Sequence, residues 1–131
     1  MAALDPNILV RFLVEDNASQ LAAAKKLITR CVNERESLYV PVTVSLELEW
    51  VLRSNFGFRK EAVIDTLSQL LSSFELTFES EGALEVALTL YGKGGADYSD
   101  CLHVALAYVA GEQPMWTFDK AAAKLDGARL L

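Results

Sequence analysis

Short apolar segments alternate along this chain with longer segments whose apolar residues recur every three or four positions. The short segments have strand-like patterns and lie at residues 2–4, 38–40, 74–78, 115–118 and 128–131. The longer segments have helical spacing and lie at residues 6–13, 19–31, 44–52, 63–71, 83–90 and 98–110. Strands separated by helices predict an α/β domain with a mostly parallel sheet. Ser19 is the expected cap of the second helix, and Gly92, Gly94 and Gly95 predict a loop.

Size and composition narrow the class of protein further. The 131 residues predict a single globular domain over 1–131, because 52% are hydrophobic and no linker or low-complexity segment interrupts them. A net charge of −6 argues against a basic protein that coats nucleic acid. Cys31 and Cys101 do not make a disulfide framework. No apolar segment has the roughly 18 residues of a membrane span, and no signal-peptide pattern opens the chain, so we expect a cytoplasmic protein.

Acidic residues stand where two of the predicted strands end. Asp5 follows the first strand and Asp119 follows the strand at 115–118. If both strands are parallel members of one sheet, the two carboxylates emerge at the same edge, where ligand sites of open α/β sheets lie. Glu47 lies near the start of the helix after the second strand. Asp97 and Asp100 begin a later helix and share one of its faces.

Carboxylates gathered from distant parts of a chain repel one another unless a cation compensates them. Clustered oxygen ligands suit Mg²⁺ or Mn²⁺. Such an ion activates a water molecule and offsets charge on a phosphoryl group. The sequence therefore indicates metal-assisted hydrolysis of a phosphodiester. The alternative for each acid on its own is a structural role. Asp5, Asp97 and Asp119 would then be helix caps, and Glu47 would be a solvated helix residue.

Four blocks of sequence carry a family resemblance. They are residues 1–12 (MAALDPNILVRF), 44–52 (VSLELEWVL), 95–105 (GADYSDCLHVA) and 116–120 (WTFDK). In their order and spacing they resemble PIN-domain proteins, specifically VapC-type toxins of bacterial toxin–antitoxin pairs. This resemblance implies a three-layer α/β/α sandwich around a central, mostly parallel sheet. It also implies a Mg²⁺- or Mn²⁺-dependent endoribonuclease that uses metal-activated water, forms a homodimer and is held inactive by a VapB-type antitoxin.

The resemblance also implies the site residues. The acids that match the family's positions are Asp5, Glu47, Asp100 and Asp119. Asp5 and Asp100 would be the firmest metal ligands. Glu47 is selected over Glu49 because it directly precedes Leu48 and lies three residues before Trp50, and because the two glutamates point about 200° apart around a helix. Asp97 would be an auxiliary ligand or a helix cap.

Three polar residues beside these acids are candidates for supporting roles. Asn7 would hydrogen-bond Asp5 or orient a water molecule, and Thr117 would orient Asp119 or a nucleophilic water molecule. Ser99 would bind water, and a structural role is the alternative for each of the three. His103, which is the chain's one histidine, is interpreted as structural because it lies in an apolar helix.

Two other functions stay open beside the toxin ribonuclease. One is a PIN-domain nuclease in RNA processing outside toxin–antitoxin biology. The other is a non-catalytic PIN-like binding module, which fits less well because all four acids are present. For an antitoxin, the candidate docking surface is an apolar stripe that could equally be core. It consists of Phe12, Leu13, Val51, Leu52 and Phe56.

Overall fold

The computed structural model describes residues 2–131; Met1, which opens the first block of the family resemblance, lies outside them. The chain divides into two compact units, of which the first ends at Glu79 and the second spans Ser80–Leu131. That residues 1–131 form a single domain stays a prediction.

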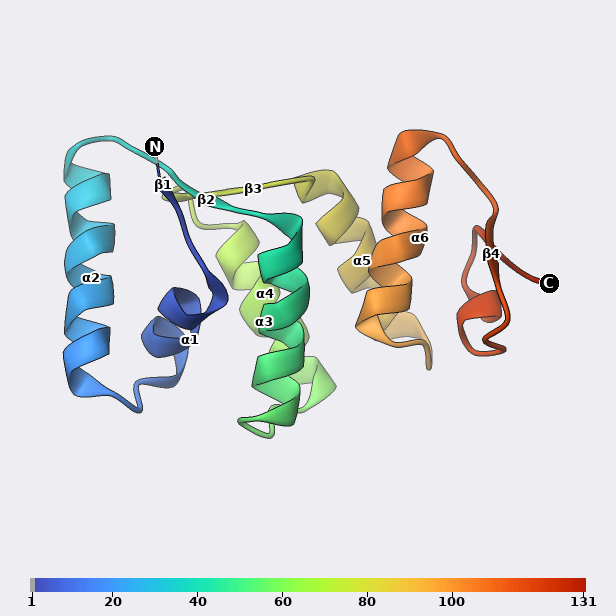
Figure 1. The fold of residues 1–131 in the computed structure, drawn as a ribbon, viewed down its shortest axis with the longest axis horizontal. Coiled ribbons are helices and arrows are strands. Elements are labelled where there is room, and N and C mark those ends of the chain that lie inside the picture. Colours follow the sequence, from blue (N-terminus) through green and yellow to red (C-terminus); the bar gives the residue numbers. More distant parts are fainter. Residues whose placement is uncertain (1) are drawn as a thin grey trace. The chain divides into compact units, whose positions relative to one another are not determined.

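The first unit, over its described residues 2–79, contains three strands and four helices (Figure 1). In chain order they are β1 (Ala2–Ala3), α1 (Pro6–Val14), α2 (Ala18–Asn33), β2 (Leu38–Val40), α3 (Val42–Ser54), α4 (Lys60–Leu71) and β3 (Leu76–Phe78). All strand pairs are parallel, in the order β1-β2-β3, with Ala3 beside Tyr39 and Tyr39 beside Thr77. The helices between the strands supply the long crossovers that parallel pairing requires.

The second unit contains two helices packed side by side and a small sheet. Its elements are α5 (Glu81–Lys93), α6 (Tyr98–Ala110), β4 (Met115–Thr117), the 3₁₀ helix η1 (Ala122–Lys124) and β5 (Ala128–Leu130). Trp116 pairs with Arg129 in the parallel β4–β5 ladder. The two helices lie against each other (Figure 1), and Ala87 of α5 and Ala105 of α6 are fully buried. The predicted α/β class with parallel strands is confirmed, and the strands form two hydrogen-bonded sheets, with β1 in one and β4 in the other.

Three local predictions need correction. Asn17, not Ser19, caps α2, because the Asn17 side chain accepts a hydrogen bond from the Gln20 N–H at 3.0 Å. The strand predicted over 74–78 begins only at Leu76, since a turn hydrogen bond from the Leu76 N–H to the Ser73 carbonyl takes up its start. Gly92, assigned to a loop, lies inside α5.

Burial settles other expectations. Leu52 is fully buried, so this member of the apolar stripe is core rather than a free docking surface, while the other members are half-buried. Cys31 and Cys101 are both buried, and no disulfide joins them, as their number in the sequence had indicated. Within residues 2–131, no helix combines the length and apolar character needed to cross a bilayer.

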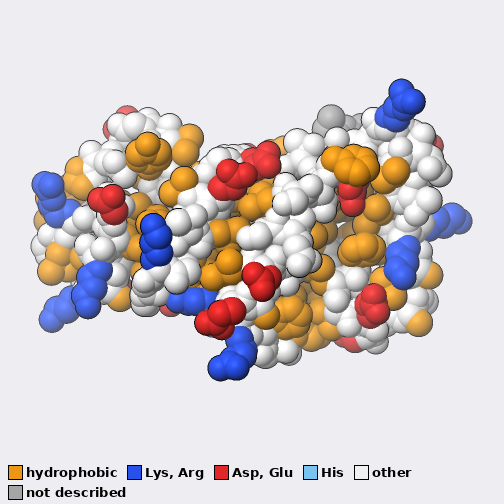
Figure 2. All heavy atoms as spheres, turned by 180° about the vertical axis from the view of Figure 1, so that it is seen from behind, with side chains coloured by type: hydrophobic (Ala, Val, Ile, Leu, Met, Phe, Trp, Pro, Cys, Tyr) orange, Lys and Arg blue, Asp and Glu red, His pale blue; other side chains and the backbone are white. Residues whose placement is uncertain are grey.

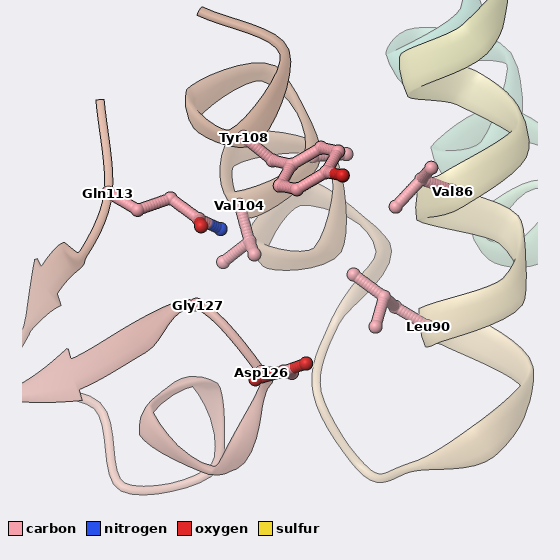
Figure 3. A pocket seen from close by; sticks show the side chains of 8 residues that line it. Val86, Leu90, Val104, Tyr108, Gln113, Asp126 and Gly127 are labelled. Carbon is pink, nitrogen blue, oxygen red and sulfur yellow. The ribbon is translucent and has the colours of Figure 1, made fainter. Parts of the chain in front are cut away.

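Two glycines of the second unit should respond in opposite ways to alanine. Gly127 has φ +94°, and a Cβ there would come 2.2 Å from Gln113 Nε2. Figure 3 shows Gln113 and Gly127 beside Val104 at a pocket of about 340 Å³. We expect Gly127→Ala to lower the free energy of unfolding by about 1–3 kcal/mol because of this strain. Gly82→Ala, in α5 and with open space around its Cβ, should raise it by about 0.5–1 kcal/mol. Urea titrations of both variants measure the difference, and equal stabilities would contradict the prediction.

Candidate functional site

Asp5 stands at the turn from β1 into α1. It is the N-cap of α1, and its Oδ1 accepts hydrogen bonds from the Asn7 N–H at 2.8 Å and the Ile8 N–H at 3.4 Å. Pro6 favours this start, because a proline in the first turn has no N–H to satisfy. The capping interpretation of Asp5 is therefore correct. Since both bonds go to Oδ1, the cap does not use Oδ2, and the exposed carboxylate can serve a cation as well.

Glu47 and Glu49 lie on α3 in different surroundings. Glu47 is exposed, whereas Glu49 is only 3% exposed. The Arg53 Nε donates to Glu49 Oε2 at 2.9 Å, one helical turn away. Glu49 thus has a structural position, and Glu47 presents its carboxylate to solvent. The difference agrees with the choice of Glu47 from the sequence, although its role as a ligand stays a prediction.

Asp119 follows β4, and its side chain accepts hydrogen bonds from the backbone of residues that follow it. Its Oδ1 accepts from the N–H groups of Ala121 at 2.8 Å and Ala122 at 3.0 Å, so it caps the turn that leads into η1. The Asp119 N–H in turn donates to Thr117 Oγ1 at 3.0 Å. Thr117 therefore restrains the backbone of Asp119, which is the contact that an orienting residue would make.

Asp97 and Asp100 lie at the start of α6. Asp97 occupies the N-cap position in an extended conformation, without a capping bond from its side chain. Burial raises the pKa of Asp100 above its usual value, the negative charges of Asp119 and Asp97 raise it further, and His103 opposes the shift. The charges of the two other candidate site acids in this unit, Asp97 and Asp119, therefore act on Asp100. His103 is exposed, which does not fit a buried structural histidine.

The predicted site residues divide between the two units. Asp5, Asn7 and Glu47 belong to the first; the second unit holds Asp97, Ser99, Asp100, Thr117 and Asp119. Across residues 2–131, no three His, Cys, Asp or Glu side chains are gathered closely enough to hold a metal ion. That the acids of the two units form one site stays a prediction.

The chemistry of the second unit's acids suits a divalent cation. Asp97, Asp100 and Asp119 supply only carboxylate oxygens, which are the ligands that Mg²⁺ and Mn²⁺ prefer. Their mutual repulsion at Asp100 is an electrostatic cost that a bound cation would offset. The donor chemistry of these three acids therefore suits the predicted metal, and a ligand set that also includes Asp5 and Glu47 stays what the family resemblance implies.

A pocket of about 590 Å³, which was not predicted from the sequence, lies beside Asp5. It lies between α1 and α2, and Asn7, Arg11 and Gln20 contribute polar side chains to it. Asn7 and Arg11 are four residues apart on α1, so their side chains share one helix face, and this spacing could have been read from the sequence. Elsewhere, Figure 2 shows the Lys and Arg side chains of one face as separate groups rather than one continuous basic patch.

Comparison with known proteins identifies relatives along almost the whole chain. The PIN domain family matches residues 2–128. A protein named VapC ribonuclease from Aquifex aeolicus (strain VF5) is 23% identical over 125 residues, which cover 95% of this chain and 92% of that protein. The family match spans the turn at Asp5, the α3 glutamates, the start of α6 and the end of β4.

Proposed function

This chain belongs to the PIN-domain family, and on that premise we propose that it is a Mg²⁺- or Mn²⁺-dependent endoribonuclease that hydrolyses RNA phosphodiester bonds. One observation carries the proposal. Each acid at a family position presents its carboxylate at least partly to solvent, and none is buried like Glu49. The acids are Asp5, Glu47, Asp100 and Asp119. The similarity to a VapC ribonuclease supports RNA as the substrate.

Each residue has a role within this proposal. Asp5 and Asp100 are the main metal ligands, Glu47 and Asp119 complete the set, and Asp97 is auxiliary. When bound, a divalent cation makes a water molecule more acidic and offsets charge on the phosphoryl group.

The remaining roles belong to the chain's polar residues. Thr117 holds the Asp119 backbone, while Asn7 and Ser99 lie in the first turns of α1 and α6, where their side chains can orient water or RNA. A water molecule attacks phosphorus, the P–O3′ bond breaks, and the products carry a 3′-hydroxyl and a 5′-phosphate.

The proposal includes a biological setting. The protein acts as the toxin of a toxin–antitoxin pair, forms a homodimer and is inhibited by a VapB-type antitoxin. The similarity to a protein named VapC supports this setting. A gene for a small antitoxin beside this chain's own gene would favour it over an RNA-processing role.

Sequencing of RNA 5′ ends tests the activity. Total bacterial RNA is incubated with the purified protein and Mg²⁺ or Mn²⁺, beside an EDTA control and Asp100→Asn. We expect discrete cuts with 5′-phosphate ends only for the wild type with metal, because the variant has lost a charged ligand. Cyclic phosphate ends, or equal cutting in EDTA, would contradict the proposed hydrolysis.

Metal binding should also appear without any RNA. A ligand that binds only the folded chain stabilises it by about 2.7 kcal/mol at a hundred times its Kd. We expect Mn²⁺ to raise the wild-type free energy of unfolding by an amount of this order, and to raise that of Asp100→Asn much less. Urea titrations with MnCl₂, or with NaCl at the same ionic strength, measure the effect. Equal stabilisation of the two proteins would place the metal elsewhere.

A further inference from the structure

The pocket between α1 and α2 has an apolar wall. Ile8 from α1 and Ala23 and Leu27 from α2 line it. Its volume of about 590 Å³ falls within the range of about 300–1,000 Å³ for sites that enclose small ligands. A wall of this kind favours a flat, weakly polar group such as a nucleobase or the face of a sugar.

The same pocket contains hydrogen-bonding groups that an aliphatic occupant would not use. Asn7 and Gln20 each offer an amide that both donates and accepts, which is the pattern that reads the edge of a base. Gln20 lies in the first turn of α2, where its backbone N–H is bound by the Asn17 cap. The cap therefore holds the backbone of Gln20, from which the side chain extends, in one position.

Arg11 adds a positive charge to the pocket. One of its terminal nitrogens donates to Asp16 Oδ1, and this bond lowers the pKa of Asp16. Arg11 Nε is buried and has no hydrogen-bond partner within the described chain. A guanidinium has five N–H donors, so Arg11 keeps donors for a phosphate oxygen while Asp16 holds the side chain in place.

From these contacts we propose that the pocket binds one unpaired nucleotide of the substrate RNA, next to the phosphodiester that Asp5 helps to cut. The base lies against Ile8, Ala23 and Leu27, and Asn7 and Gln20 contact its edge. Arg11 contacts a phosphate. The proposal rests on the ribonuclease function and adds a recognition site to it. An apolar protein segment is the competing occupant, but it would leave the amides and the guanidinium without partners.

Neighbouring alanines on α2 allow a matched test of the pocket. Ala23 and Ala22 are both exposed, but only Ala23 lines the pocket. Binding of fluorescein-labelled rA8, rC8 and rU8 is measured by fluorescence anisotropy in EDTA, so that no cleavage occurs. Ala23→Trp fills the pocket and should weaken binding of the best probe at least about tenfold, whereas Ala22→Trp should leave its Kd within about twofold. Equal Kd values for the two variants would overturn the proposal.

A second pair of variants separates phosphate contact from the ion pair. Arg11→Met should weaken RNA binding and lower the slope of log K against log salt by about 0.7, the value for one phosphate contact with a single strand. Asp16→Asn removes the same ion pair but frees the guanidinium, so binding should stay equal or become tighter. If both variants weaken binding equally, Arg11 has only a structural role. Circular dichroism verifies that the variants fold. Gln20→Ala is a further substitution outside the ion pair, and it should change the order of affinity for the rA8, rC8 and rU8 probes.

The outcomes separate this inference from the proposed function. If the wild type binds RNA through the pocket but cuts none with any metal, the nuclease proposal fails and the pocket stands. If it cuts RNA and Ala23→Trp behaves like Ala22→Trp, the pocket proposal alone fails. If Ala23→Trp still binds RNA but no longer binds the protein encoded by the neighbouring gene, the pocket is a protein-docking site. That result would overturn the inference.

Discussion

Replacing Asp5 by Asn is expected to slow RNA cleavage at least about 100-fold while changing the free energy of unfolding by less than about 0.5 kcal/mol. The two effects separate because the carboxylate has two tasks. Its Oδ1 accepts the N–H groups of Asn7 and Ile8, and an asparagine oxygen can accept them too. The negative charge that a divalent cation needs is lost. Initial cleavage rates and urea titrations measure the two effects.

Two control variants complete this test. Asp5→Ala removes both the charge and the cap, so it should lose the activity and also about 1 kcal/mol of stability. Asp65→Asn removes one negative charge from an exposed position on α4 and should leave the cleavage rate unchanged. Full activity of Asp5→Asn would show that Asp5 is a helix cap and nothing more.

The two α3 glutamates should show opposite defects. Glu47→Gln is expected to lower the cleavage rate at least about 100-fold with little change in stability, because Glu47 is exposed and is the proposed ligand. Glu49→Gln should keep the rate within about threefold but lose about 1–3 kcal/mol of stability. Glu49 is 3% exposed, and its charged carboxylate accepts the hydrogen bond from Arg53 Nε.

The same cleavage assay and urea titrations distinguish the alternatives. A large loss of activity in Glu49→Gln, with Glu47→Gln active, would move the ligand by two residues along α3. Loss of activity in both variants at full stability would mean that both carboxylates reach the reaction. The first result would correct the residue assignment, and the second would show that burial does not separate the two roles.

Features that depend on neighbouring residues were predicted well from the sequence. The helix over 98–110 has the predicted bounds, and α1 begins at Pro6 as expected. Asp5 and Asp119 cap the turns that follow them, which the position of each acid had suggested. Helix hydrogen bonds and caps join residues two to four positions apart, so a short window of sequence contains the information.

Features that depend on distant residues were decided by the tertiary structure. The sequence did not show that Leu52 is buried, that Asp100 carries a raised pKa, or that β1 and β4 belong to different sheets. Each depends on segments far apart in the chain, because burial and charge repulsion are set by which groups lie close together in the folded structure. Asn17 in place of Ser19 is the local exception, since both residue types make good caps and only the backbone conformation selects one.

The division between sequence and structure is also visible at the candidate site. The sequence alone predicted which carboxylates form the site and placed Glu47 and Glu49 on different sides of one helix, because residue type and helical period are properties of the chain itself. Only the tertiary structure brought Arg11 and Gln20 together beside Asp5, since they lie on different helices and meet through the packing of α1 on α2. Local hydrogen bonds join residues that are close in the sequence, so the order of residues predicts them. A pocket between two helices forms only when the helices pack together.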